Sequence, residues 1–268
     1  MRIALGFWGL TRSLKYTVAS IEQHILHVLK RANIDYTIFL HTYSFSSEYT
    51  NTRTGEIGIQ LDFTEYTLLH PDFVQVDNQD EVKANIDVTR YRSRRDPWNS
   101  GYQSVDNFLC SMYSKRELGR MIQTSGIEFD YVLFLRPDVV YLHDFDVSML
   151  SLATDTTVCI PNFALWGPKK FNDRFCLTKY SNAFKYSELF EHMLDYSRRK
   201  PLHSEIYQAT ALCEWHKLHI QYVPFFFNRV RANGCEQMDC THDEHSIHRT
   251  RFFDGRGRFI NRYVRVWK

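Results

Sequence analysis

The sequence predicts an α/β fold in which a mainly parallel central sheet is flanked by helices. Short apolar, β-branched runs that suit buried strands alternate with longer segments whose apolar residues recur at helical spacing. The chain has 268 residues, of which 44% are hydrophobic and 15% aromatic, enough for a substantial core. No repeat or low-complexity linker interrupts it. We therefore expect a single domain over residues 1–268.

The first half of the chain begins with the run RIALGFW, and we expect a strand at residues 2–8. Residues 14–30 place their apolar side chains on one helical face, and Ser13 stands where a serine side chain commonly caps a first turn. Short apolar runs rich in β-branched and aromatic residues then predict strands at 35–41 and 73–77.

The second half repeats the alternation. A long segment with apolar residues three or four apart predicts a helix at 102–124, and the run YVLFL predicts a strand at 131–136. The same two patterns then predict a strand at 156–166, helices at 182–198 and 204–218, and a last strand at 220–227.

The predicted central strand ends at Arg136-Pro137-Asp138. Proline has no backbone N–H, so strand pairing should stop at Pro137. An arginine and a carboxylate then remain at the carboxyl edge of the strand, where open α/β sheets bind their ligands. A carboxylate suits a divalent cation, and a guanidinium suits a phosphate or a sugar hydroxyl. The pattern indicates a metal-assisted reaction on a phosphate-bearing substrate.

Charge and composition limit the partners. The chain has 33 basic and 31 acidic residues, a net charge of +2, which predicts no nucleic-acid partner. Residues 249–268 are the exception, with seven basic residues and one acidic residue, a composition that suits a diphosphate, a nucleic acid or an anionic membrane surface. A solvated basic terminus without such a partner is equally open. No export signal and no bilayer-length apolar run is visible, so we expect a cytoplasmic protein with reduced thiols and no transmembrane segment.

A cluster of cysteines and histidines precedes that basic tail. Its residue types are those of zinc ligands, but their spacing matches no common zinc finger. A structural zinc site and a polar loop that lends one histidine to another site both remain open. The cluster consists of Cys235, Cys240, His242, His245 and His248.

The turn after the first strand, GFWGLTRS at residues 6–13, carries glycines and an arginine. Glycines let backbone amides approach a nucleotide, and Arg12 can pair with a phosphate. The same turn is equally consistent with a tight connection that requires small residues. It matches neither the dinucleotide fingerprint GxGxxG nor the P-loop pattern.

Two later segments place polar side chains near predicted element ends. In residues 171–175, FNDRF, an amide, a carboxylate and a guanidinium lie between aromatic residues, which suits a sugar. Glu205 lies at the start of the helix expected at 204–218, where it can serve as a general base. Both segments also fit ordinary helix starts, in which such residues cap the helix or stabilise its first turn.

Four segments together resemble nucleotide-sugar-dependent glycosyltransferases of the GT-A fold. The segments are RIALGFWGLTRS, YVLFLRPDVV, FNDRF and HSEIYQATAL, which follow one another in the expected order over nearly the whole chain. The most similar type is the compact transferase that builds surface glycans in bacteria and large DNA viruses. The resemblance implies a GT-A-like, Rossmann-type single domain with a nucleotide-binding half, 1–125, and a metal, donor-sugar and acceptor half, 126–268.

The resemblance also implies a reaction: transfer of a sugar from a nucleoside diphosphate, UDP-linked, to a glycan hydroxyl, with inversion and with Mn²⁺ or Mg²⁺ as cofactor. Asp138 matches the second carboxylate of the family's Asp-x-Asp metal motif. Arg136 replaces the first and can itself neutralise diphosphate charge. Glu205 falls where inverting members present the catalytic base, with Asp173 as the second candidate. His245 would complete the metal shell.

The remaining site residues follow from the hypothesis of such a transferase. Separately, the polar segments 42–60 and 86–101 are candidate loops on the acceptor side, and loops without such a function are equally open. Two other functions stay open: another metal-dependent phosphate enzyme, such as a nucleotidyltransferase or phosphohydrolase using Asp138 with Asp144 or Asp146, and a non-catalytic binder of glycans or nucleic acids. The expected substrate-binding residues are Gly6, Trp8, Gly9, Thr11, Arg12, Gln103, Asp106, Arg136, Asn172 and Arg174.

Overall fold

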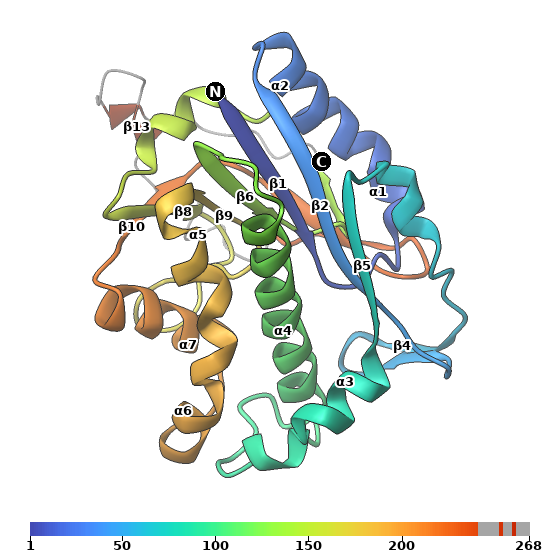
Figure 1. Ribbon diagram of the computed structural model, residues 1–268. Helices are drawn as coiled ribbons and strands as arrows, with labels where there is room; N and C mark the ends of the chain where they lie inside the picture. Colours follow the sequence, from blue (N-terminus) through green and yellow to red (C-terminus); the bar gives the residue numbers. More distant parts are fainter. Residues whose placement is uncertain (241–251, 254–258, 261–268) are drawn as a thin grey trace.

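The computed structural model describes residues 1–240, 252–253 and 259–260, and a seven-stranded sheet lies at its centre (Figure 1). Its strands are β1 (Arg2–Trp8), β2 (Asp35–Ser44), β5 (Phe73–Asn78), β6 (Tyr131–Leu135), β8 (Thr157–Pro161), β9 (Cys176–Lys179) and β10 (His219–Val223). They are ordered β10-β8-β9-β6-β1-β2-β5. Every neighbouring pair is parallel except the two that contain β9. This sheet, with its flanking helices, confirms the predicted α/β class.

Helices cover both faces of the sheet. They are α1 (Leu14–Ile21), α2 (His27–Arg31), α3 (Gln79–Ile86), α4 (Gln103–Thr124), α5 (Tyr180–Ser187), α6 (Met193–Arg199) and α7 (Ser204–Thr210). Single π-helical turns, Glu22–Leu26 and Ala211–Trp215, join α1 to α2 and extend α7. Short 3₁₀ turns lie at Thr52–Thr54, Glu65–Leu69, Val88–Tyr91, Val147–Leu152 and Glu188–His192.

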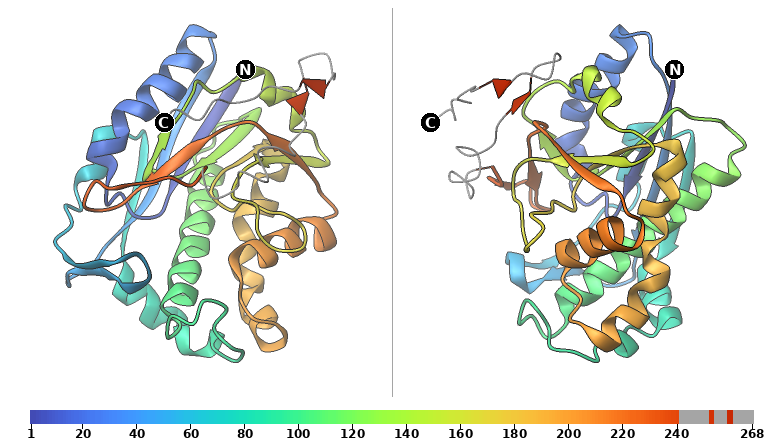
Figure 2. Two further views of the ribbon diagram at one scale, coloured as in Figure 1. Left: turned by 180° about the vertical axis from the view of Figure 1, so that it is seen from behind. Right: turned by 90° about the vertical axis from the view of Figure 1, so that its left-hand side faces the viewer.

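Alternate residues of β1 point to opposite faces and build two separate cores. Ile3 and Leu5 pack into the core that contains the apolar face of α1 and α2, whereas Ala4 and Trp8 pack into the core of α4 to α7. Figures 1 and 2 show these two helical layers from opposite sides. The chain therefore passes from β1 to β2 over one face and from β5 to β6 over the other.

This change of face places the topological switch point of the sheet between β1 and β6, which pair in parallel. β6 ends at Leu135, one residue earlier than predicted, and Arg136 and Pro137 follow it. The chain then forms β7 (Val139–Tyr141), which leaves the central sheet and joins β11 (Phe227–Val230) and β12 (Glu236–Gln237) in a small sheet of order β12-β11-β7. A side chain on either side of Pro137 thus lies at the carboxyl edge of the sheet.

Several element predictions need correction. Ser13 makes no capping bond; its hydroxyl donates to the Val230 carbonyl oxygen at 3.0 Å. The expected loop 42–60 contains the end of β2 and the hairpin of β3 (Tyr49–Asn51) and β4 (Glu56–Ile59). The antiparallel strand β9 was not predicted, because four residues carry too little periodicity. β13 (Phe252–Phe253) and β14 (Phe259–Ile260) form a further, two-stranded antiparallel sheet.

Among the described helices, none has the length and apolarity needed to cross a bilayer.

Gly6 provides a test of the packing between β1 and α4. We expect Gly6→Ala to lower the free energy of unfolding, measured by urea denaturation, by about 1–3 kcal/mol. The reason is that the added methyl would lie 2.7 Å from Cδ2 of Leu118. In the double variant with Leu118→Ala, the shortened side chain makes room, so the cost should fall below the sum of the two single costs. Additive costs would show that Leu118 is not the obstacle.

Candidate functional site

A cavity of about 510 Å³ opens at the carboxyl ends of β1 and β6. The loops after both strands, the first turns of α4, the β3–β4 hairpin and the β11–β12 hairpin contribute to its wall. Its lining combines cations with aromatic rings, which is the composition that suits a nucleotide. The charged lining residues are Arg12, Arg53, Arg136, Arg229, Arg231, Asp138 and Asp173, and the aromatic ones are Trp8, Tyr43, Tyr49, Trp98 and Phe108.

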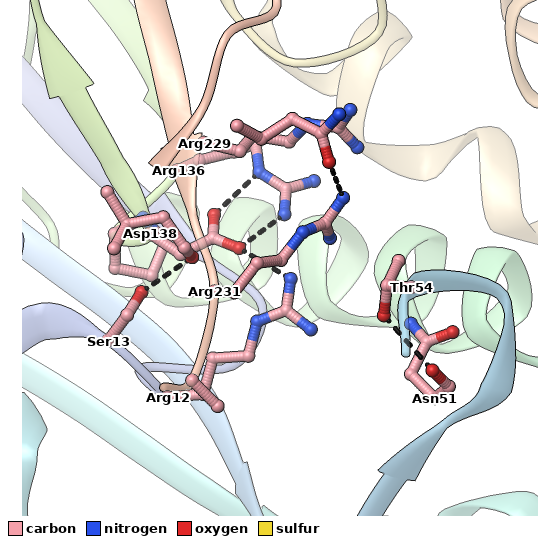
Figure 3. A network of polar contacts seen from close by, with 12 residues as sticks. Arg12, Ser13, Asn51, Thr54, Arg136, Asp138, Arg229 and Arg231 are labelled. Carbon is pink, nitrogen blue, oxygen red and sulfur yellow. Dashed lines mark hydrogen bonds and ion pairs between the residues drawn. The ribbon is translucent and has the colours of Figure 1, made fainter. Parts of the chain in front are cut away.

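Asp138 lies at the floor of this cavity and is only 1% exposed. Its Oδ1 accepts from Nε of Arg136 at 2.8 Å, and its Oδ2 accepts from Nη2 of Arg136 at 2.7 Å and from Nη2 of Arg12 at 3.1 Å. Burial alone would raise the pKa of the carboxyl, but the two guanidinium groups outweigh it and hold the pKa well below its usual range. Figure 3 shows both arginines directed at Asp138.

Two further buried carboxylates tie the hairpins to this centre. Glu56, in β4, pairs with Arg12 at 3.4 Å and accepts from the backbone N–H of Ala232 at 2.8 Å, so it joins the β3–β4 hairpin to the turn after β11. Asp239 accepts from Nε and Nη2 of Arg229 at 2.8 and 2.6 Å and pairs with Arg174 at 3.3 Å. These contacts hold the arginines of distant segments around one cavity.

Aromatic rings lie against several of these cations. The guanidinium carbons of Arg136, Arg12 and Arg53 lie 5.2, 5.3 and 5.7 Å from the ring centroids of Trp8, Tyr49 and Trp98, respectively. A ring face attracts a nearby cation and limits the water that reaches it. The cavity wall thus presents planar groups on which a base or a sugar can stack, next to charged groups that suit phosphate.

Arg231 is only weakly compensated by carboxylates. Its Nη1 is 3.8 Å from Glu56, and its Nη2 donates to the neutral amide oxygen of Gln237 at 2.5 Å. Burial lowers the pKa of Arg231 to about 10, and repulsion from Arg229 and Arg12 adds to the effect. The cavity therefore contains positive charge that its own carboxylates do not fully offset.

Lys115 lies beneath the cavity and is 1% exposed. Its ammonium donates to Tyr186 Oη and Gln208 Oε1, both at 2.8 Å, and to the backbone oxygen of Asp173 at 3.2 Å. It also lies 4.3 Å from the ring centroid of Trp8. The bond to the backbone of Asp173 positions the loop that carries this carboxylate into the cavity.

Glu205 does not line the cavity, although its neighbour Ser204 does. The Glu205 carboxylate accepts from the Ser204 hydroxyl and pairs with Nδ1 of His203 at 3.2 Å. Burial raises the pKa of Glu205, but the contacts with His203 and Ser204 outweigh it and lower the pKa overall. Asp173 is therefore the candidate base that faces the cavity directly.

The structure brings part of the predicted site together. Trp8, Gly9, Arg12, Arg136, Asp138 and Asp173 all line the cavity. The other predicted residues make internal contacts instead: Gly6 packs against Leu118, Gln103 bonds Thr50 and Thr52, Asp106 pairs with Arg92, and Asn172 bonds Phe163 and Arg174. Arg174 pairs with Asp239, and the backbone oxygen of Thr11 accepts from Leu14. His245 lies outside the described residues, as do His242, His248 and the basic side chains of 249–268.

Arg229 and Arg231 line the cavity but were not predicted as site residues. Both follow the predicted strand 220–227, in the segment FNRVRAN, where arginines at alternate positions share one side of a strand. That spacing was the available signal. The expected loops 42–60 and 86–101 do reach the cavity, through Tyr49, Arg53 and Trp98 among others.

The expected divalent cation fits this donor set poorly. In the part of the chain that the structure describes, no group of three or more His, Cys, Asp or Glu side chains lies close enough to hold a metal ion. Both oxygens of Asp138 already accept from arginines, so a cation there would displace Arg12 and Arg136 and face their charge. The metal role of Asp138 thus stays a prediction that its contacts do not favour.

Comparison with known proteins gives matches only among solved structures. No family model and no curated protein matches the chain. The galactosyltransferase LgtC with donor and acceptor analogues matches at 12% identity and a TM-score of 0.41, over 83% of this chain and 73% of LgtC. Mouse xyloside xylosyltransferase 1 matches at 13% and 0.40, over 83% and 85% of the two chains.

A third match is the glycosyltransferase GlyE of Streptococcus pneumoniae, at 12% identity and a TM-score of 0.37, over 82% of this chain and 44% of GlyE. At these identities and scores the likeness identifies no function. The case for a function therefore rests on the residues of this chain.

Lys115 provides a pH test of the buried layer. Burial lowers its pKa in the folded chain to about 8, from the ordinary 10.5. Between these values the unfolded chain holds a proton that the folded chain has lost, so raising the pH favours the folded state. We expect the free energy of unfolding of the wild type, minus that of Lys115→Met, to rise from pH 8 to pH 10.5. A difference that stays flat or falls would show that Lys115 titrates elsewhere.

Proposed function

We propose that this chain is a glycosyltransferase that moves a hexosyl or pentosyl group from a nucleoside diphosphate sugar to a hydroxyl of a glycan acceptor. The observation that carries the proposal is one cavity, at the switch point of a mainly parallel sheet, that holds four clustered arginines, stacking rings and a carboxylate. Arginines suit the diphosphate, rings suit the base or sugar, and the carboxylate suits proton removal.

The proposed chemistry is a single displacement. The acceptor oxygen attacks the anomeric carbon, the bond from that carbon to the phosphate oxygen breaks, and the diphosphate leaves with the electron pair. Arg136 and its neighbours stabilise the charge that grows on the diphosphate. Asp173, which lines the cavity, accepts the proton of the attacking hydroxyl. We take the donor to be UDP-linked and the anomeric configuration to invert, as the family resemblance implies.

The competing phosphohydrolase and nucleotidyltransferase readings receive less support. They require further carboxylates beside Asp138 to hold metal ions. Asp144 instead pairs with His24 at 2.8 Å and with Arg31 at 2.9 Å, and Asp146 accepts from the backbone N–H of Ser148 at 2.9 Å. Neither lines the cavity. The proposed mechanism uses no divalent cation, because both oxygens of Asp138 already accept from arginines.

Product analysis tests the proposed activity. The chain is incubated with UDP-, GDP- and CMP-linked sugars and a panel of glycan acceptors, and the products are identified by mass spectrometry. We expect one nucleotide sugar to give the free nucleotide, cleaved at the sugar, together with an extended acceptor. Cleavage between the two phosphates would overturn glycosyl transfer in favour of the phosphohydrolase reading. The anomeric configuration of the product, read by NMR, tests inversion.

The assignment of the base is tested by three matched variants. We expect Asp173→Asn to lower kcat by a factor of about 10² to 10⁴ with little change in donor affinity, because a neutral amide cannot accept the hydroxyl proton. Asp155→Asn, on the exposed surface near Lys179, is the control and should retain wild-type kcat. Glu205→Gln should cost less than about tenfold, because this carboxylate lies behind Ser204. If Glu205→Gln shows the larger loss, the base is Glu205.

A further inference from the structure

The cavity contains four arginines that we call the arginine cluster: Arg12, Arg136, Arg229 and Arg231. They come from three separate segments, the loop after β1, the end of β6, and β11 with the turn that follows it. Figure 3 shows their side chains gathered beside Asp138, which Arg12 and Arg136 contact directly. Like charges gather this closely only where something opposes their repulsion.

The carboxylates of the site oppose it incompletely. The arginines that line the cavity or belong to its ion-pair network outnumber the carboxylates of the described residues there by six to four. Such an excess in a partly buried site favours an anionic ligand. The arginines are Arg12, Arg53, Arg136, Arg174, Arg229 and Arg231, and the carboxylates are Glu56, Asp138, Asp173 and Asp239.

The cluster also has the geometry for phosphate. A guanidinium presents several N–H groups in a planar fork that matches two phosphate oxygens. The side chains of Arg136 and Arg229 remain 22% and 23% exposed, and both line the cavity. Their free N–H groups are therefore accessible to a ligand, while Asp138 and Asp239 hold each guanidinium in place from below.

We infer that the arginine cluster binds the diphosphate of the donor directly, without a divalent cation, and that Asp138 is its resident counter-anion. In this role Asp138 keeps Arg12 and Arg136 together before the donor binds. The inference rests on the proposed function, because it assumes a nucleoside diphosphate in this cavity. It departs from the Asp-x-Asp arrangement, in which carboxylates hold a metal that in turn holds the diphosphate.

Metal dependence of nucleotide binding is the first test. UDP, GDP and CDP are titrated calorimetrically into the full chain, once with EDTA and once with Mn²⁺. We expect at least one nucleotide to bind in EDTA with a Kd within about threefold of its Kd in Mn²⁺. Binding that appears only with Mn²⁺ would overturn the inference and leave the proposed function standing. Failure of all three nucleotides under both conditions, with folding confirmed, would overturn both.

One variant and its control test the role of Arg231 under the EDTA condition. Arg231→Gln should weaken the nucleotide Kd by about 10- to 100-fold, because it removes a charged hydrogen-bond donor to phosphate. Arg31→Gln, whose side chain pairs with Asp144 outside the cavity, is the matched control and should bind like the wild type. An unchanged Kd for Arg231→Gln would contradict its place in the cluster.

Asp138→Asn separates the two roles of that carboxylate. The amide of Asp138→Asn keeps one acceptor oxygen for the arginines but removes the negative charge that competes with the diphosphate. Nucleotide binding should therefore be unchanged or tighter, while the melting temperature falls. If Asp138 is instead a metal ligand, its removal should abolish the binding measured with Mn²⁺. Loss of nucleotide affinity in a variant that is folded by circular dichroism would overturn the counter-anion role. If the variant does not fold, the titration of the wild type in EDTA and the Arg231→Gln variant still decide the inference.

Discussion

Asp138 receives hydrogen bonds from two arginines that lie far apart in the sequence, Arg136 beside it and Arg12 in the loop after β1. The contact with Arg136 exists because β6 ends at Leu135 and the chain bends at Pro137, so that the residues on either side of the proline meet. Breaking a buried ion pair by removing one partner costs about 3–5 kcal/mol, since the other charge stays behind unpaired. The walls of the cavity depend on this pair: Arg12 also reaches Glu56 of the β3–β4 hairpin, and β7, which follows Asp138, pairs with β11.

Two further ion pairs preorganise the proposed anion site. Glu56 and Asp239 hold the arginines of two hairpins in fixed positions before any ligand arrives. Groups already oriented toward a developing charge need little reorganisation when it appears. Beneath them, Lys115 bonds the backbone of the segment that carries Asp173. The ring of Trp8, which lies against both Lys115 and Arg136, connects the candidate base's support to the arginines.

Local patterns predicted most of the fold and part of the site. The helix at 102–124 and the strands at 2–8 and 131–136 were predictable because their periodicity or apolar run is encoded within a few residues. Arg136, Asp138 and Arg12 were predictable because strand ends in such sheets carry ligands. Arg229 was not, because it reaches the cavity only through the pairing of β11 with β7, about ninety residues away along the chain. Nor could local sequence show that both Asp138 oxygens would be taken by arginines, which changed the expected metal ligand into a candidate counter-anion.

The most direct test is a crystal structure of the chain grown with the nucleoside diphosphate it binds and with Mn²⁺ present, including anomalous data at the manganese edge. We expect diphosphate oxygens within hydrogen-bond distance of the guanidinium groups of Arg136, Arg229 and Arg231, with no manganese peak between the diphosphate and Asp138. A manganese ion coordinated by Asp138 and bridging the two phosphates would contradict it. A nucleotide bound outside this cavity would remove its basis altogether.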